Sequence, residues 1–440
     1  MIRNTRLFLG DGTVKENATV LIRDGKISDI FDGAGPDADS IRAEVVEGSG
    51  KTLLPGLIDV HVHLSSPGGM SANTNDFDID KVMARDDAAL LYSGVVAARS
   101  TGDGVDSSFK LRKAIQGGSK LGAELRICGP MFTVEGGHGT EYTRNMPAAV
   151  GETMKAQIVR LPKTVEEARQ MVRDLKGQGI DGIKAILESG FGEGLLYTRM
   201  DVALFRAVAE EAHTQHLPLA VHTGDSRDVT DAVDANATSI EHGSWRDQIP
   251  DAVLAKMAKN GIYLDPTIGV VDAYAGYFAG KADVLDNSLV QQTVSSNVMK
   301  GTRDFVTSGK GTDAAKAELF AKAAAQSIGN MLRAWKAGVP LVMGSDSGNP
   351  LVFPGPSMHR ELQLWVKAGI PNAVALQAAT GNAAKLLGVA DRLGGIRKGM
   401  DADLLLVDGN PLQDITATER ISLVVFKGER VRRADLFDQK

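Results

Sequence analysis

Residues 54–64 read Leu54-Pro55-Gly56-Leu57-Ile58-Asp59-Val60-His61-Val62-His63-Leu64. The run is mostly apolar and follows a Pro-Gly turn, so we expect a buried strand that the chain enters through that turn. Successive side chains of a strand point to opposite sides, so His61 and His63 share one side and can bind one metal ion together. A His-x-His pair also arises by chance, so whether this pair indicates a metal site depends on the other residues of the chain.

The composition is that of an ordinary globular protein. The 440 residues are 43% hydrophobic and 24% charged, enough for one large α/β barrel or two to three smaller domains. A net charge of −6 without a Lys/Arg run argues against a nucleic-acid partner. No window approaches 18 consecutive apolar residues, and Gly10-Asp11-Gly12 follows the N-terminus, so we expect neither a membrane span nor a secretory signal. The single cysteine, Cys128, excludes an intrachain disulfide and favours a reducing cytoplasm.

Both ends of the chain have the pattern of short antiparallel strands. Residues 19–23 and 26–30 flank Asp24-Gly25, a dipeptide typical of hairpin turns. Similar short apolar runs return near the C-terminus, at 403–407, 421–427 and 428–431. Neither end is long enough to bury its own core. We therefore expect residues 1–53 and 395–440 to pair into one small β-sandwich.

Between the two ends, predicted strands alternate with predicted helices. Eight strand-like runs are found, at 54–64, 94–100, 125–128, 182–186, 217–222, 237–242, 261–264 and 339–343. Amphipathic helices separate several of them, at 165–176, 202–213, 228–235 and 251–260. This alternation predicts a parallel α/β fold, and eight strands favour a (β/α)8 TIM barrel over 54–394, with a doubly wound open sheet as the alternative. The segment of about 274–334 is too long for one crossover helix and predicts an inserted helical pair over the site.

Polar residues recur where these predicted strands end. They are His61, His63, Lys184, His222, His242 and Asp346. Taken singly, Lys184 could be a surface lysine and Asp346 a turn residue. Barrel enzymes carry their chemistry at the strand ends, so four imidazoles, one lysine and one carboxylate at such positions together indicate one site.

Several motifs jointly resemble the amidohydrolase superfamily over nearly the whole chain. The run from Pro55 to His63 resembles its opening motif, and 239–243 and 343–347 resemble its sixth- and eighth-strand motifs. Residues 378–388 and 399–404 resemble its C-terminal helix and the return to the β-sandwich. Within the superfamily the chain is most similar to the imidazolonepropionase-related branch, which includes metal-dependent Xaa-Pro dipeptidases and carboxypeptidases. Gly136-Gly137-His138-Gly139 is similar to a substrate-loop motif of that branch.

The resemblance implies a centre of two divalent metal ions. One ion would be bound by His61, His63, Lys184 and Asp346, and the other by Lys184, His222 and His242. An ammonium group repels a cation, so Lys184 would first add carbon dioxide and become N6-carboxylysine, a carbamate able to bridge two ions. Imidazole and carboxylate ligands suit Zn2+ best, with manganese, iron or cobalt as substitutes.

The implied reaction is hydrolysis of an amide C–N bond by a hydroxide that the two metal ions share. Asp346 would act first as general base and then as general acid, while His138 would help to polarise the carbonyl group. Four residues just beyond strand ends could contact a substrate carboxylate or carbonyl: Tyr142, Arg144, Arg227 and Tyr274. We expect a small-molecule substrate, a dipeptide or an N-acyl amino acid. We further expect a cytoplasmic homo-oligomeric hydrolase of the metallopeptidase type.

Three alternatives stay open. Peptidases of the branch usually carry a tyrosine shortly after the fifth-strand histidine, where this chain has His222-Thr223-Gly224-Asp225-Ser226, so a cyclic amide, lactone or carbamate is an alternative substrate. A mononuclear deaminase would usually lack the lysine and carry glutamate in place of Asp225. A non-catalytic scaffold would have lost metal ligands, whereas all six positions are filled here.

Overall fold

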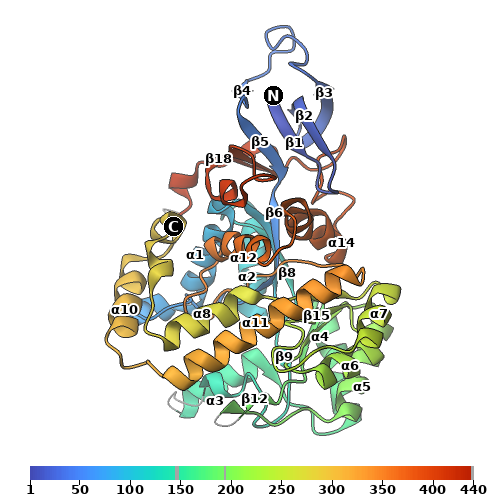
Figure 1. Cartoon of the computed structure of the whole chain (residues 1–440), viewed down its shortest axis with the longest axis vertical. Coiled ribbons are helices and arrows are strands. Elements are labelled where there is room, and N and C mark those ends of the chain that lie inside the picture. The colour runs from blue at the N-terminus through green and yellow to red at the C-terminus, as the bar shows by residue number, and fades with distance from the viewer. Residues whose placement is uncertain (144–147, 193–194, 438–440) are drawn as a thin grey trace.

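Strands from both ends of the chain lie in one sheet at one end of the molecule (Figure 1). The computed structural model describes residues 1–143, 148–192 and 195–437. The strand order is β19-β18-β17-β5-β1-β2-β3, with β4 beside β1. The strands are β1 (Ile2–Phe8), β2 (Val14–Arg23), β3 (Lys26–Asp32), β4 (Val46–Glu47), β5 (Lys51–Pro55), β17 (Leu404–Asp408), β18 (Ile421–Phe426) and β19 (Glu429–Arg430). The two ends are thus hydrogen-bonded to each other within one continuous sheet, which we call the terminal sheet, and the predicted β-sandwich of 1–53 and 395–440 stays a prediction.

The interior of the terminal sheet is apolar and its turns follow the sequence signals. Leu53 of β5 pairs with Leu406 of β17, and both side chains are buried. Asp24 and Gly25 join β2 to β3 with φ of 51° and 77°, the left-handed conformation that a two-residue hairpin turn requires at both positions. The Asp24-Gly25 prediction is therefore confirmed.

The larger part of the molecule is an α/β body with parallel strands. One group pairs in the order β6 (Leu57–Val62), β7 (Val95–Ser100) and β8 (Glu124–Ile127). The other has the order β10 (Val159–Arg160), β9 (Met131–Phe132), β11 (Ile183–Ile186), β14 (Leu219–His222), β15 (Ser239–Glu241) and β16 (Tyr263–Asp265). Every pairing within both groups is parallel. A short hairpin of β12 (Gly190–Gly192) and β13 (Leu195–Leu196) stands apart.

The first and last predicted strands differ from expectation. The first is split, because β5 ends at Pro55 and β6 begins at Leu57. The segment predicted as a strand at 339–343 forms isolated bridges in place of a regular strand, Leu264 with Leu341 and, further on, Val62 with Ser347. Pro340 lacks an N–H, so it accepts a backbone hydrogen bond from Leu264 but donates none. Closure of the parallel strands into a barrel stays a prediction.

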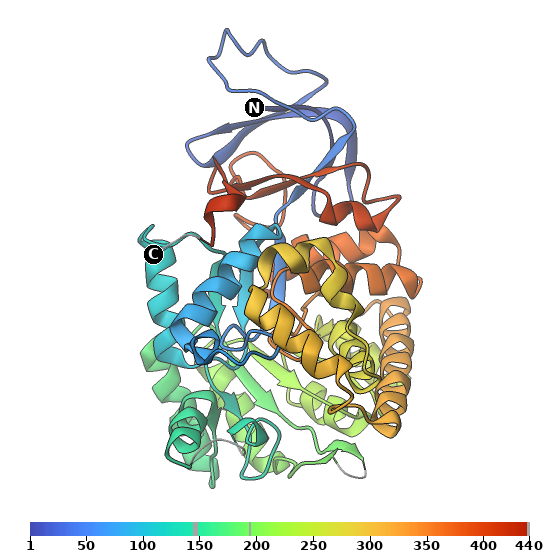
Figure 2. The same ribbon diagram turned by 90° about the vertical axis from the view of Figure 1, so that its left-hand side faces the viewer.

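Helices connect the parallel strands and cover the α/β body (Figure 2). They include α1 (Ile79–Tyr92), α2 (Val105–Gln116), α3 (Ala148–Ile158), α4 (Val165–Gln178), α5 (Val202–Thr214), α6 (Ser226–Asp234) and α7 (Asp251–Asn260). Three more follow the last parallel segment: α12 (Pro356–Lys367), α13 (Asn372–Gln377) and α14 (Ala383–Leu386). None of the helices in the described part of the chain has the length and apolar character that a membrane crossing requires.

The region predicted as a helical pair contains four helices, so that prediction was wrong. They are α8 (Ile268–Phe278), α9 (Ser288–Thr293), α10 (Ser296–Thr307) and α11 (Ala314–Lys336). Asn287 and Ser295 accept hydrogen bonds from backbone N–H groups at the starts of α9 and α10, which gives each short helix its own beginning. Phe278 of α8 packs on Phe320 of α11 with ring centroids 5.5 Å apart. These two helices form a wall beside the strand ends.

Candidate metal-binding active site

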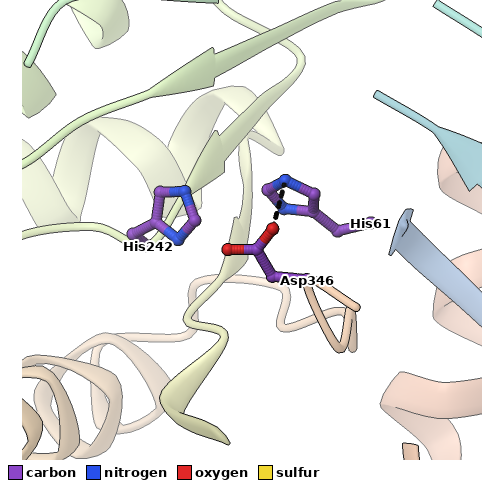
Figure 3. A group of neighbouring side chains, drawn as sticks. All are labelled: His61, His242 and Asp346. Atoms are coloured by element: carbon purple, nitrogen blue, oxygen red, sulfur yellow. Dashed lines mark ion pairs between the residues drawn. The ribbon is translucent and has the colours of Figure 1, made fainter. Parts of the chain in front are cut away.

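The six predicted metal ligands meet at the carboxyl ends of the parallel strands. Figure 3 shows His61, His242 and Asp346 pointing toward one another. All six line one cavity of about 230 Å³: His61, His63, Lys184, His222, His242 and Asp346. The structure thus brings together side chains that are up to 285 residues apart, since 346 − 61 = 285.

The cluster has two ends. At one end, Asp346 Oδ1 lies 3.0 Å from His63 Nε2 and 3.5 Å from His61 Nε2. His61 Nε2 in turn lies 3.0 Å from Lys184 Nζ. At the other end, His242 Nε2 lies 2.8 Å from His222 Nδ1. The two ends are adjacent, since the ring centroids of His61 and His242 are 5.2 Å apart, and the assignment of ligands to two ions stays a prediction.

Three non-glycine residues at the site have left-handed backbone conformations. They are His242 (φ 69°), Thr267 (φ 41°) and Asp346 (φ 53°). Such conformations cost on the order of 1–3 kcal/mol each and cluster at functional sites. The cost is tolerated because the surrounding hydrogen bonds hold these residues: Asp346 N donates to His61 O at 2.8 Å, and His242 N to Asp265 O at 2.7 Å.

Three of the histidines have their outer ring nitrogen held by a neighbouring side chain. The pairs are His61 Nδ1 with Glu241 Oε2 (3.1 Å), His222 Nε2 with Glu188 Oε2 (2.8 Å) and His242 Nδ1 with Thr267 Oγ1 (2.6 Å). In each pair the other nitrogen faces the cluster. This is the arrangement by which proteins orient imidazole ligands toward a metal and select their tautomer.

Glu241 is itself held by a buried ion pair. Arg99 donates from Nη2 to Glu241 Oε1 at 2.8 Å and from Nε to Val60 O at 2.6 Å. Burial opposes ionisation of Glu241, but Arg99 and His61 outweigh it and hold the pKa well below its usual range. A carboxylate is therefore kept charged behind His61.

Burial and charge shift the pKa values of the cluster. Burial lowers the pKa of the Lys184 amine, against the pull of Glu241 and Asp346. Burial and the Lys184 charge lower the pKa of His61 to about 4. For Asp346 burial acts in the opposite direction, yet His61 and His63 hold its pKa well below the usual range. Neutral imidazoles beside an ionised carboxylate are the forms that bind metal ions.

The residues fit a divalent cation. Asp346 Oδ1, which faces the cluster, is a buried atom without a hydrogen-bond partner, which would cost about 1–3 kcal/mol if nothing compensated it. Two of the four histidines, His61 and His242, lie with Asp346 close enough to bind one ion, and imidazole with carboxylate is a donor set that suits zinc and similar ions. The chemistry of the cluster therefore agrees with metal binding.

His138 lies beside His222 at the second end of the cluster. Its ring centroid is 4.7 Å from that of His222, and its Nδ1 lies 2.6 Å from Glu141 Oε1. Burial alone would lower the pKa of His138, but Glu188 and Glu141 outweigh it and raise the pKa. Tyr142 Oη is 3.4 Å from His138 Nε2. His138 can thus act as a hydrogen-bond donor toward the cavity.

The other predicted substrate residues divide into three groups. Tyr142 and Tyr274 line the cavity. Arg227 is exposed on α6. Arg144 lies outside the described residues, so its predicted role stays a prediction.

Sequence reasoning missed Glu188 and the aromatic walls. Glu188 is 1% exposed, and burial raises its pKa to about 7. Gly224 makes room for it, because a Cβ there would lie 2.8 Å from Glu188 Cγ. A carboxylate two residues beyond the β11 strand was a usable signal. Phe191, Trp245 and Phe320 had no such signal, because they come from three distant segments.

Comparisons with known proteins agree with this geometry. The model of the Amidohydrolase family matches residues 52–431. Ochratoxinase from Aspergillus niger is 24% identical, with 97% of this chain and 85% of that protein covered. A solved Xaa-Pro dipeptidase with bound methionine has a TM-score of 0.77 and 24% identity, covering 98% of both chains. A putative prolidase from Bifidobacterium longum has a TM-score of 0.74 and 26% identity, covering 100% of this chain and 97% of that one.

The family match spans most of the chain and includes all six candidate ligands. Proteins of this family generally use divalent metals, which suits the ligand clusters described above. The resemblance seen in the sequence motifs is thus confirmed. The chain belongs to the amidohydrolase family and is a hydrolase that acts on carbon–nitrogen bonds.

Proposed function

We propose that this protein hydrolyses an amide bond of a small molecule with the aid of two divalent cations, Zn2+ in the first instance. The observation that carries the proposal is the convergence of four imidazoles, Lys184 and Asp346 around one cavity. The first ligand set would be His61, His63, Lys184 and Asp346, and the second Lys184, His222 and His242. Cations held there supply a nucleophilic hydroxide at neutral pH and polarise the scissile carbonyl.

Lys184 would serve both sets as a carbamate. Its side chain is 1% exposed, and burial lowers the pKa of the amine, which increases the share of the neutral form that reacts with carbon dioxide. In that reaction a bond forms between Nζ and the carbon of carbon dioxide, and a proton leaves the nitrogen. The product is a carboxylate at the end of a long side chain, beside His61.

Asp346 is the proposed general base and acid. Its position against His61 and His63 lets it take a proton from the attacking water and return it to the leaving nitrogen. His138, held at Nδ1 by Glu141, directs its other nitrogen into the cavity to stabilise the developing oxyanion. Glu241, Glu188 and Thr267 keep the histidine rings in place.

We also propose that the parallel strands close into a (β/α)8 barrel, with residues 339–347 as the eighth member. Backbone hydrogen bonds support this reading on both sides of the segment. Leu264 N donates to Pro340 O and Val342 N to Leu264 O on the β16 side. Val60 N donates to Met343 O and His63 N to Ser347 O on the β6 side. A ring of this kind places all strand ends at one rim.

The alternatives differ in how well the residues suit them. A deaminase would need a free acid in place of Asp225, but the side chain of Asp225 accepts from Asp228 N at the start of α6 and pairs with Arg246. The names of the relatives, an ochratoxinase and a Xaa-Pro dipeptidase, support amide hydrolysis. A dipeptide, an N-acyl amino acid, a cyclic amide and a carbamate are all candidate substrates. Location in the cytoplasm and a homo-oligomeric state stay predictions.

Asp346→Asn tests the proposal. We expect it to lower kcat on any amide substrate by about 10²–10⁴-fold, because the base is lost while amide oxygen and imidazoles still bind metal. Metal content by elemental analysis should fall by no more than half, and Asp304→Asn, an exposed aspartate of α10, should behave as wild type. Full activity of Asp346→Asn would refute the role assigned to Asp346. If the wild-type protein is purified without metal and does not bind added Zn2+, the proposed metal centre is refuted.

A further inference from the structure

The catalytic cavity continues into a second cavity. The second has a volume of about 510 Å³ and shares five lining residues with the first: His63, Met131, Tyr142, Tyr274 and Asn349. The shared residues include a metal-ligand candidate, so the two cavities meet beside the cluster. A substrate whose scissile bond lies at the cluster would therefore extend into both.

The first cavity, which we call the aromatic chamber, has a wall of aromatic rings. Phe191 stacks on Trp245 with ring centroids 4.6 Å apart and an interplanar angle of 10°. Phe320 contacts Phe191 at 4.6 Å and Tyr274 at 5.0 Å. The rings come from the segment after β11, the segment after β15, and helices α8 and α11. A flat apolar group fits such a wall, because aromatic rings stack and exclude water.

The second cavity, which we call the outer chamber, is also apolar. Its wall beyond the shared residues includes Phe77, Ile79, Met154 and Ile158. Phe77 is 48% exposed, a large fraction for a phenylalanine that has no other visible role. Flexible methionine side chains of the kind found here adapt to apolar ligands of varied shape.

The charges of the two chambers argue against a substrate carboxylate. Among the described lining residues Lys184 is the one Lys or Arg, and it is buried against His61. Glu141, Glu188 and Asp346 line the same cavity. A carboxylate bound away from the cations would be buried near these acids without a partner, which is costly.

We infer that the preferred substrates are uncharged amides with an apolar, ring-sized group on each side of the scissile bond, an inference that rests on the proposed hydrolytic function. One group occupies the aromatic chamber and the other the outer chamber. Water adds its oxygen to the acyl carbon, the C–N bond breaks, and the leaving amine takes a proton. The products are an aromatic or apolar carboxylic acid and an apolar amine.

The test uses the zinc-loaded enzyme and a matched pair of amides. N-Benzoyl-2-phenylethylamine and N-benzoyl-L-phenylalanine differ by one carboxylate. We expect kcat/KM to be about tenfold or more higher for the uncharged member, since it leaves no buried charge unpaired. Removal of either ring, in N-acetyl-2-phenylethylamine or N-ethylbenzamide, should lower kcat/KM about tenfold or more. A preference for N-benzoyl-L-phenylalanine, or indifference to both rings, would overturn the inference.

Two variants assign the rings to the chambers. In Phe191→Ala, removal of one substrate ring should lower kcat/KM much less than it does in wild type, because the contacts of that ring with the aromatic chamber are already gone. In Phe77→Ala, the same should hold for removal of the other ring, which occupies the outer chamber. Neither residue belongs to the ligand cluster, and thermal unfolding of each variant controls for folding. If both variants leave both penalties unchanged, the rings do not occupy these chambers and the inference is wrong.

Arg144→Ala adds a check on the carboxylate. We expect it to leave the ratio of kcat/KM for the matched pair unchanged, whereas a loss confined to N-benzoyl-L-phenylalanine would overturn the inference. The panel also includes dipeptides and N-acyl amino acids. If the metal-loaded enzyme cleaves these in preference to the uncharged amides, only the substrate class fails. If it cleaves no amide of the panel, the proposed function fails as well.

Discussion

The terminal sheet and the strand-end site handle charge in opposite ways. In the terminal sheet the interior is apolar and the ion pairs are on the outside, such as Lys15 with Asp32 and Lys398 with Asp29. At the strand ends, by contrast, charged side chains are fully buried. Arg99, Lys184 and Glu241 are each 5% exposed or less.

The difference shows which region serves stability and which serves chemistry. Exposed pairs contribute little, with a typical value of about 0–1 kcal/mol, so the terminal sheet is held by its apolar core. Buried charges cost free energy unless partners converge on them, and residues at the site also have strained backbones. We expect changes at the site to affect metal binding and activity, and changes in the terminal sheet to affect stability alone.

The largest effect should follow Lys184→Ala. The variant should lose most of its metal and about 10³-fold or more of its activity, because the proposed bridging carbamate cannot form. Short carboxylic acids such as acetate or propionate should restore part of both, since they can occupy the space of the lost side chain. Metal content is measured by elemental analysis and activity by kcat/KM. Wild-type metal content would rule out Lys184 as a bridging ligand.

Leu406→Ala should have a large effect on stability and little effect on activity. Leu406 is 1% exposed in the core of the terminal sheet, so truncation should cost about 2–5 kcal/mol of unfolding free energy. The kcat of the folded variant should stay within a factor of two of wild type. The unfolding free energy is measured by denaturant unfolding. A loss of kcat without a loss of stability would contradict the separation of the two regions.

Glu188→Ala should weaken metal retention about 10–100-fold, because Glu188 holds the outer nitrogen of His222. Glu188→Gln keeps an acceptor for that nitrogen, so its effect should be smaller. Retention is followed as the rate of zinc loss to a chelator, which does not depend on turnover. Glu318→Ala, on the exposed face of α11, is the control. Equal zinc loss from wild type and Glu188→Ala would show that Glu188 does not orient His222.

The smallest effect should follow Lys398→Ala. Lys398 is 72% exposed in its pair with Asp29, so unfolding free energy should change by less than about 0.5 kcal/mol. Metal content and kcat should be unchanged, which also makes this variant the lysine control for Lys184→Ala. A cost above about 1 kcal/mol would mean that surface charge does stabilise the terminal sheet.

Much of the site could be predicted because strand ends are visible in the sequence. His61, His63 and His222 follow short apolar runs, and parallel strands end at one edge. Glu188 was missed because it lies two residues beyond the end of β11, outside the predicted strand, although a carboxylate so near a strand end was a usable signal. The eighth strand was predicted from a short apolar run, but that segment forms only isolated bridges. The helical pair was predicted from length, whereas capping residues divide the region into four helices.

The sequence by itself determined the alternation of strands and helices, the joining of the two ends in one sheet, and the identity of six candidate ligands. These follow from local periodicity and from residue chemistry, which act over a few neighbours. Only the tertiary structure decided which nitrogen of each histidine faces the cluster, that Glu188 stands behind His222, and that aromatic rings from distant segments form one wall. Such contacts join segments 20 or more residues apart, and local sequence carries no record of how those segments pack.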